Sequence, residues 1–280
     1  MKVIKKIKET REFIRKNRAE GKSVGFVPTM GALHEGHLSL MECATNNNDI
    51  VAVSVFVNPV QFNNPEDLKK YPRDLQGDLK KMEQLGVDLV FAPGVEEMYP
   101  EEVTRTYDFG GLDRVMEGQY RPGHFNGVAV VVHKLFEIIT PDRAYFGEKD
   151  YQQLAIIRKL VEIENLKVKV IGCPIIRETD GLAMSSRNSR LSKEERAIAP
   201  VIYKTLKKAT SLKGTKTVEE VKRFVHEEIN KTEKMELEYF EIADSKTLTP
   251  IDSWEASDKP RGFVAAYLGN VRLIDNMAFN

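Results

Sequence analysis

Two histidines stand three residues apart in the segment FVPTMGALHEGHLSL. The segment joins an expected strand end, a Gly-containing turn and an expected helix start, which is where α/β folds present backbone N–H groups to phosphates. His34 and His37 flank Gly36 across this helix start, so both imidazoles can face one phosphate group. Imidazoles there would stabilise charge that develops on phosphate oxygens. The segment therefore predicts a phosphate site.

The histidine pair has two other interpretations. Both residues could be capping or surface histidines. A zinc site is disfavoured because HxxxH, rather than HxxH, is the usual helical spacing for two ligands, and no third ligand lies close in the sequence. The strand, the glycines and the helix start together favour the phosphate site over both.

Two later segments offer groups suited to phosphates. GEKD at Gly147–Asp150 follows an expected strand, which puts the Lys149 ammonium at the sheet edge where ligands bind. MSSR at Met184–Arg187 supplies two hydroxyls and a guanidinium in a loop that we expect to be mobile. Each segment has a plainer interpretation. GEKD could be a solvated helix start, and MSSRNSRLS a loop before a helix that Ser192 caps, with Glu195 three residues later.

Neutral amides follow an apolar strand in FVNPVQF. Asn58 and Gln61 could orient the hydroxyl or carboxylate groups of a small ligand. A turn would explain Asn58 before Pro59. Gln61 lies between Val60 and Phe62, however, and an amide buried there needs hydrogen-bond partners. We therefore predict a small-ligand pocket beside the phosphate site.

The composition limits the partners of the chain. The 280 residues include 42 Lys and Arg against 42 Asp and Glu, so no global field would attract nucleic acid. The two cysteines, Cys43 and Cys173, are far apart and form no CxxC, which argues against a metal knuckle or a disulfide and favours buried thiols. The sequence contains no segment of secretory or membrane-spanning character, so we expect a cytoplasmic protein.

Strands and helices must alternate to position these residues. Apolar runs of strand length alternate with amphipathic stretches, which predicts parallel strands joined by crossover helices. The strands are expected at Val24–Val27, Ile50–Val57, Asp88–Phe91, Arg143–Phe146 and Lys167–Cys173. The helices are expected over residues 38–47, Asp67–Leu85 with an interruption at Pro72, Val128–Ile139 and Tyr151–Glu164.

The sequence changes character after Pro174. Charged helices are expected over Lys193–Ser211 and Val218–Lys231, followed by strands at Leu237–Ile242, Gly262–Leu268 and Val271–Asp275. This order predicts a smaller α+β domain. We place the boundary near residue 175, which gives domains of 1–175 and 176–280.

Five motifs together resemble one enzyme family. PTMGALHEGH, FVNPVQF, RPGHFNGV, FGEKDYQQL and DGLAMSSRN, in this order, are similar to the motifs of the pantothenate synthetases, the pantoate–β-alanine ligases. The resemblance runs from about Val24 to Asn188, and LIDN at Leu273–Asn276 resembles the C-terminal end of the family. More distantly, HEGH resembles the HIGH signature of the nucleotidyltransferase superfamily, and MSSR stands where that superfamily has its mobile KMSKS loop.

The resemblance implies a fold and a reaction. It implies a Rossmann-type parallel-sheet N-terminal domain, a smaller α+β C-terminal lid and a homodimer. The implied reaction joins pantoate and β-alanine at the expense of ATP, giving pantothenate, AMP and pyrophosphate through an enzyme-bound pantoyl adenylate. The cofactor implied besides ATP is Mg²⁺.

The resemblance also implies roles for single residues. His37, His34 and Lys149 are the expected catalytic residues, with His37 the proton donor of the family. Gln61 and Gln153 are expected at the pantoate site, where the FVNPVQF segment also places Asn58. Asp78 matches a family acidic position associated with the metal, or it could be a plain helix-surface aspartate. Arg121 and His124 could contribute to phosphate or substrate binding, or could belong to a turn. The positions expected to bind ATP are Met30, Gly31, Ala32, Leu33, His34, Glu35, Gly36, His37, Gly147, Glu148, Lys149, Asp150, Ile176, Met184, Ser185, Ser186 and Arg187.

Two rival functions are compatible with parts of the pattern. A nucleotidyltransferase of the same superfamily would act on a phosphate-containing acceptor, but the amides Gln61 and Gln153 suit a neutral pocket better. A non-catalytic nucleotide-binding module would need the Gly turn, but not the paired histidines, Lys149 and the MSSR loop together.

Overall fold

The computed structural model describes residues 1–63 and 65–279 and divides into two compact units. The N-terminal unit consists of residues 1–113, 118–148 and 153–174. The C-terminal unit consists of residues 114–117, 149–152 and 175–280. The expected domains were continuous stretches, whereas each unit combines separate pieces of the chain.

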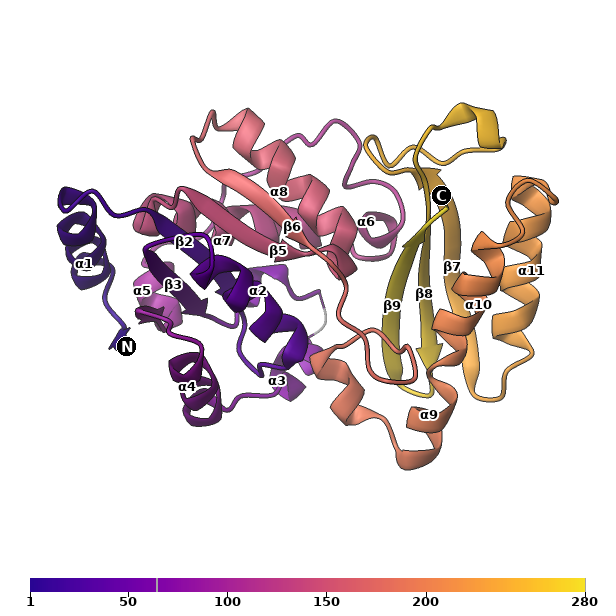
Figure 1. Cartoon of the computed structure of the whole chain (residues 1–280), viewed down its shortest axis with the longest axis horizontal. Coiled ribbons are helices and arrows are strands. Elements are labelled where there is room, and N and C mark those ends of the chain that lie inside the picture. The colour runs from indigo at the N-terminus through magenta and orange to yellow at the C-terminus, as the bar shows by residue number, and fades with distance from the viewer. Residues whose placement is uncertain (64, 280) are drawn as a thin grey trace. The chain divides into compact units, whose positions relative to one another are not determined.

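The N-terminal unit contains a six-stranded parallel sheet in the order β1-β4-β3-β2-β5-β6. Strands β2, β3, β5 and β6 of this sheet are labelled in Figure 1. The four inner strands are rich in β-branched and aromatic residues and are largely buried, as parallel strands covered on both faces require, whereas the edge strands are more exposed. Their bounds are β1 Lys2–Ile4, β2 Val24–Thr29, β3 Ile50–Val55, β4 Leu89–Phe91, β5 Arg143–Gly147 and β6 Lys169–Cys173.

Alternating strand residues face two separate cores, because successive side chains point to opposite faces. Phe26 and Phe91 join the core formed with three helices, α1 Ile7–Ala19, α7 His124–Ile139 and α8 Tyr151–Ile163. Val27 and Val53 join the core formed with two helices, α2 Glu35–Thr45 and α4 Leu75–Gln84. The shorter helical pieces are η1 Pro59–Gln61, α3 Pro65–Lys70, α5 Val95–Met98, α6 Glu117–Tyr120 and η2 Glu148–Asp150.

The expected helix over Asp67–Leu85 is interrupted around Pro72, as predicted, and forms two helices, α3 and α4. Pro72 disfavours helical geometry at the residue before it and has no N–H to donate, so one continuous helix cannot form. Asp74 then caps the second helix by accepting the Gly77 N–H at 2.9 Å. The edge strand β1 and the helix α1 were not predicted.

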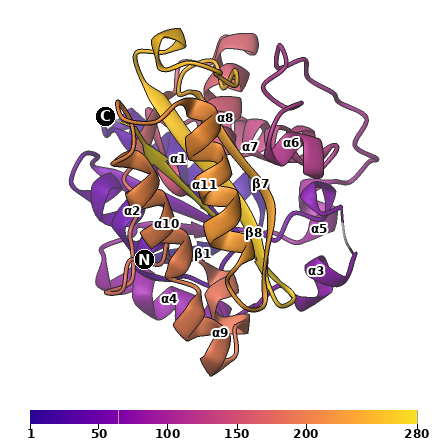
Figure 2. The ribbon, with the colours of Figure 1, turned by 90° about the vertical axis from the view of Figure 1, so that its right-hand side faces the viewer.

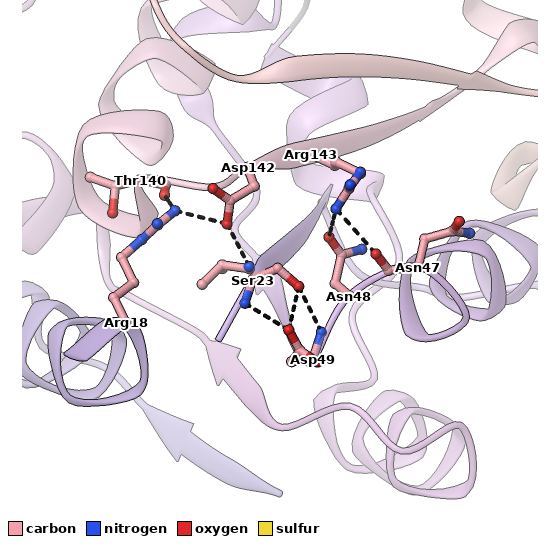
Figure 3. A network of polar contacts seen from close by, with 9 residues as sticks. Arg18, Ser23, Asn47, Asn48, Asp49, Thr140, Asp142 and Arg143 are labelled. Carbon is pink, nitrogen blue, oxygen red and sulfur yellow. Dashed lines mark hydrogen bonds and ion pairs between the residues drawn. The ribbon is translucent and has the colours of Figure 1, made fainter. Parts of the chain in front are cut away.

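A polar network joins the amino ends of the central strands (Figure 3). Arg18 Nη2 and Val24 N both donate to Asp142 Oδ2, at 3.0 and 2.7 Å. Ser23 Oγ donates to Asp49 Oδ2 at 2.7 Å, and Arg143 Nη1 donates to Asn48 Oδ1 at 3.1 Å. These side chains bind one another at one end of the sheet, while the predicted ligand-binding loops follow the opposite, carboxyl ends.

The C-terminal unit contains an antiparallel sheet in the order β7-β8-β9. Its strands are β7 Met235–Asp244, β8 Pro260–Leu268 and β9 Val271–Ala278. One face packs on α10 Val201–Thr210 and α11 Val218–Asn230, whose apolar residues Leu206 and Val225 lie in the same core (Figure 2).

The expected helix over Lys193–Ser211 is also divided, into α9 Lys193–Ile198 and α10, with Pro200 between them. The predicted cap is present: Ser192 Oγ accepts the Glu195 N–H at 3.1 Å, and Glu195 Oε2 accepts the Ser192 N–H at 2.8 Å. A parallel sheet with helices on both faces and a smaller α+β unit confirm the predicted fold class. Among residues 1–63 and 65–279, no helix has the length and apolarity needed to cross a membrane.

Candidate functional site

Strand order places the predicted loops next to one another in the N-terminal unit. From β2 the chain proceeds through β3 to β4 on one side, and from β5 to β6 on the other. The order therefore reverses between β2 and β5, and open α/β sheets bind ligands at the carboxyl ends of the strands beside such a reversal. Met30–His37 follows β2, and Glu148 follows β5.

The histidine loop, defined as residues 30–37, leads directly into α2. His34 is the N-cap of this helix, and its Nδ1 accepts the Gly36 N–H at 3.2 Å. His37 Nδ1 lies 3.4 Å from His34 N, and the two ring centroids are 4.1 Å apart. A neutral imidazole that accepts through Nδ1 carries its proton on Nε2. The structure thus brings the two predicted histidines together at the positive end of a helix dipole.

The helix α4, which follows the histidine loop by about 45 residues in the sequence, holds the backbone of that loop. Asp78 Oδ2 accepts the Ala32 N–H at 2.9 Å, and Asp78 Oδ1 accepts the Leu33 N–H at 2.8 Å. Lys81 Nζ donates to Leu33 O at 2.6 Å. Both side chains come from α4, which packs through the buried Met82.

Gln61 lies beside the histidine loop and is buried. Its Nε2 is 3.3 Å from Met30 Sδ, and its Oε1 accepts from Asn58 Nδ2 at 3.1 Å. Asn58 is only 1% exposed and accepts from the Tyr99 hydroxyl at 2.9 Å, whose pKa is raised by burial. Asn58 also donates to Gly127 O at 3.1 Å. In the structure Asn58 therefore orients the Gln61 amide, so that Nε2 faces the histidine loop.

The RPGHF segment supports the same turn. His124 is buried, and its Nδ1 lies 2.8 Å from Gln61 O. A Cβ added to Gly127 would approach Val60 O to 2.6 Å, so the first turn of α7 lies directly against η1. Of the two interpretations of this segment, the contact of His124 favours a role in placing Gln61.

The other residues expected at the nucleotide and pantoate sites lie around the end of β5. Gly147 ends the strand, Glu148 begins η2, and Gln153 is half-buried in α8. Lys149 is 18% exposed in its side chain, with Nζ 3.8 Å from Asp150 Oδ2. Within the C-terminal unit, Asn276 Nδ2 donates to Lys149 O at 2.9 Å.

Ile176 and the MSSR segment belong to one hairpin, which we call the serine hairpin, residues 176–187. Met184 N donates to Ile176 O at 3.0 Å, so these two predicted residues are paired directly. Ser185 caps η3 Ser186–Arg190 by accepting the Arg187 N–H at 3.2 Å.

Two ion pairs anchor the serine hairpin within its unit. Arg177 binds the buried Asp275 of β9 through two hydrogen bonds, at 2.6 and 2.9 Å. Arg196 donates to Asp180 at 2.6 Å and thereby lowers the pKa of that carboxyl. The first pair could not be predicted from the sequence, because Arg177 and Asp275 are 98 residues apart.

A buried charge cluster ties the piece 114–117 to the C-terminal unit. Arg272 binds both oxygens of Glu117, at 2.9 and 2.5 Å, and also hydrogen-bonds Glu238. The Tyr239 hydroxyl donates to Glu117 at 2.9 Å. Burial alone would lower the pKa of Arg272, but its bonds to Glu117 and Glu238 raise that pKa above its ordinary value. The guanidinium therefore stays charged inside the unit.

No metal cage is found in residues 1–63 and 65–279, and the Cys173 thiol is buried. No group of three or more His, Cys, Asp or Glu side chains could hold a metal ion in that part of the chain. Both oxygens of Asp78, the predicted metal position, accept backbone N–H groups of the histidine loop. Burial, and next the neighbouring Cys43 thiol, raise the pKa of Cys173 to about 12, which disfavours its thiolate.

Comparison with known proteins gives one consistent group of relatives. The family model for pantoate-beta-alanine ligase matches residues 2–278. A pantothenate synthetase of Bacteroides fragilis is 52% identical over 279 residues, which cover 100% of this chain and 99% of the relative.

Two solved structures have the same fold. The crystal structure of pantothenate synthetase from Thermus thermophilus matches with a TM-score of 0.92 and 46% identity, covering 99% of both chains. A pantoate-beta-alanine ligase from Francisella tularensis, complexed with beta-gamma ATP and beta-alanine, matches with a TM-score of 0.83 and 38% identity. That match covers 99% of this chain and 97% of the other.

Proposed function

The chain belongs to the pantoate-beta-alanine ligase family, and from this premise we propose that it condenses pantoate with β-alanine through an enzyme-bound pantoyl adenylate. Membership confirms the family resemblance of the five motifs and the expectation of a pantoate–β-alanine ligase. The Francisella tularensis relative, with its ATP analogue and β-alanine, supports ATP as the nucleotide and β-alanine as the amine.

One observation of the structure carries the proposal. His34 and His37 stand together at the N-terminus of α2, beside the reversal of strand order, with the Gln61 amide next to Met30. A helix N-terminus with two imidazoles suits a polyphosphate. A neutral amide suits the carboxylate or hydroxyl of a small acid. The two ligands of an adenylating reaction thus find suitable groups on adjacent loops.

The first step is an in-line displacement. A carboxylate oxygen of pantoate attacks the α-phosphorus of ATP, the bond from that phosphorus to the bridging oxygen breaks, and pyrophosphate leaves. Nε2–H of His34 and His37 donates to phosphate oxygens and stabilises the charge that develops on them. Gln61 Nε2, oriented by Asn58, holds the pantoate so that its carboxylate faces the phosphorus.

The second step forms the amide. The neutral amine of β-alanine attacks the acyl carbon, the carbon–oxygen bond to AMP breaks, and the amine nitrogen loses a proton. No covalent bond to the protein is required. Lys149 and Met184–Arg187 stay predicted nucleotide contacts, and Gln153 a predicted pantoate contact.

Mg²⁺ enters this proposal as part of the nucleotide substrate. Mg²⁺ is commonly held by phosphate oxygens and water with few protein ligands, and the described residues form no cage for it. No step of the mechanism depends on a metal ligand from the chain.

We also propose that the protein works in the cytoplasm as a homodimer. The support for both proposals is the family resemblance, together with small-molecule substrates that require no membrane or nucleic acid. Sedimentation at several protein concentrations tests the dimer, and a monomer at micromolar concentration contradicts it.

The decisive experiment is exchange of labelled pyrophosphate into ATP, with Mg²⁺ and pantoate but without amine. The adenylate mechanism requires exchange that depends on pantoate, because the first step must be reversible without β-alanine. AMP release that begins only when β-alanine is added, without prior exchange, would retain the ligase and reject an independent first step.

A further inference from the structure

The histidine loop has a backbone conformation that needs support. Gly31 and Ala32 both have positive φ, at +82° and +52°. Glycine adopts this left-handed region readily, but an L-residue such as Ala32 does so at a conformational cost. Such a conformation persists where the surrounding structure over-determines it. His34, the first imidazole of the site, comes only two residues later.

The support comes from one face of α4. The Asp78 carboxylate receives the N–H groups of Ala32 and Leu33, and the Lys81 ammonium binds the Leu33 carbonyl. Asp78 is 2% exposed, so its bonds are shielded from water. Hydrogen bonds in which one partner is charged are about twice as strong as neutral ones. Three such bonds therefore fix three successive peptide units, from Gly31–Ala32 to Leu33–His34.

The approach of α4 is close. A Cβ added to Gly31 would lie 3.1 Å from both Asp78 Oδ2 and Val55 Cγ1. The helix is itself fixed, because Asp74 caps it and Met82 is fully buried in the core. A change at Asp78 therefore moves the loop rather than the helix.

We propose that Asp78 and Lys81 are positioning residues, which hold the histidine loop so that His34 and His37 face the phosphates, and that Asp78 is not a Mg²⁺ ligand. The inference deepens the proposed function and rests on it for the role of the histidines. It departs from the metal role that the family resemblance implied for Asp78. A carboxylate whose two oxygens each accept a backbone N–H, with no further acidic cluster in the described residues, is built to orient a loop.

Three variants test the proposal. Asp78→Asn keeps the shape but replaces one acceptor by an NH₂ group that faces a backbone N–H. Lys81→Met keeps most of the stem and removes the ammonium, and is the milder change if Asp78→Asn folds poorly. Asp74→Asn is the matched control, because it also removes an acidic charge from α4 while asparagine still caps a helix.

Two activity readouts distinguish positioning from metal binding. We expect kcat to fall about 10- to 100-fold in Asp78→Asn, and up to about tenfold in Lys81→Met, by analogy with misplaced catalytic groups. The Mg²⁺ concentration that gives half-maximal rate should stay within about twofold of wild type, and Asp74→Asn should resemble wild type. A requirement for Mg²⁺ raised tenfold or more, with kcat restored at high Mg²⁺, overturns the proposal.

A third readout does not depend on turnover. Long-range ¹H–¹⁵N spectra of the imidazoles, assigned with His34→Asn and His37→Asn, report the tautomer and surroundings of each ring. We expect the His34 and His37 signals to shift in Asp78→Asn and in Lys81→Met, but not in Asp74→Asn. Unchanged histidine signals in both variants overturn the positioning role, even if the wild-type protein fails to exchange pyrophosphate.

Discussion

The histidine loop and the serine hairpin are both expected to meet ATP, yet they are held in different ways. In the histidine loop, the anchors Asp78 and Lys81 bind the backbone of residues that directly precede His34. In the serine hairpin, the anchors Asp275 and Arg196 bind Arg177 and Asp180, on the arm opposite the serines. Ser185 and Arg187 are joined by a bond within their own turn.

This difference predicts that the two regions affect different kinetic constants. A loop whose functional backbone is fixed is prearranged, and its groups can act on the transition state without reorganising. A hairpin whose anchors bind only the arm opposite the serines can adjust its serine arm to a bound nucleotide. We therefore expect changes in the histidine loop to lower kcat, and changes in the serine hairpin to alter stability and the KM for ATP.

The largest effect is expected from the histidines. His34→Asn keeps a helix cap and removes the imidazole, and His37→Asn removes the second ring. Loss of one donor to a developing charge should lower kcat about 100- to 1,000-fold. Steady-state kinetics with saturating ATP, pantoate and β-alanine measure kcat. Glu42→Gln, an exposed change on the same helix, serves as the control. A kcat within threefold of wild type in either histidine variant would remove the histidine loop from catalysis.

The next effect is on stability. Asp275→Asn leaves the Arg177 guanidinium, 19% exposed, beside a neutral amide. Removing one member of a buried ion pair typically lowers the free energy of unfolding by about 3–5 kcal/mol, so the C-terminal unit should unfold at a lower urea concentration. The single tryptophan, Trp254, lies in this unit and reports its unfolding by fluorescence. An equal urea midpoint for Asp275→Asn and for the exposed change Glu236→Gln would contradict the anchoring role.

A smaller effect is expected on the serine arm of the serine hairpin. Ser185→Ala removes the acceptor of the Arg187 N–H, a bond worth about 0.5–1.5 kcal/mol. The KM for ATP should rise by roughly two- to tenfold with kcat nearly unchanged. Steady-state kinetics at saturating pantoate and β-alanine measure both constants. A fall in kcat as large as in the histidine variants would erase the distinction between the two regions.

The smallest effect is a pH dependence at Asp180. Because Arg196 lowers the pKa of this carboxyl in the folded protein, the pair stabilises the hairpin fully above about pH 4 and loses this contribution as the pH falls through the lower folded-state pKa. The side chains are 32% and 39% exposed, so the contribution is below about 1 kcal/mol. Urea unfolding of wild type and Asp180→Asn should differ at pH 6 and converge toward pH 3. A difference that grows on acidification would contradict this assignment.

The sequence indicated the parts of the site that are local in the chain. The strand, turn and helix around His34 follow one another within a few residues, so their arrangement depends on short-range geometry. Apolar runs in the sequence also located five strands of the parallel sheet, β2 to β6. They missed α1, whose buried side chains are only Thr10, Ile14 and Asn17 among many charges.

The supporting residues could not be predicted from the sequence, because they act across long separations. Asp78 follows Leu33 by 45 residues and looks like an ordinary helix-surface aspartate in its own segment. Asn58 was expected to touch substrate, and only the fold reveals that its amide is enclosed by Tyr99, Gln61 and Gly127. Both placements depend on how helices dock on the sheet, which a single segment does not encode.

The pieces 114–117 and 149–152 have a consequence for how the gene can be divided. A fragment that encodes only residues 175–280 would bury Arg272 without Glu117, its main counter-ion, and would lose the Asn276 bond to Lys149. A single recombination event that transfers residues 175–280 would therefore not transfer the complete C-terminal unit. Its inheritance is tied to two short stretches of the other half of the gene.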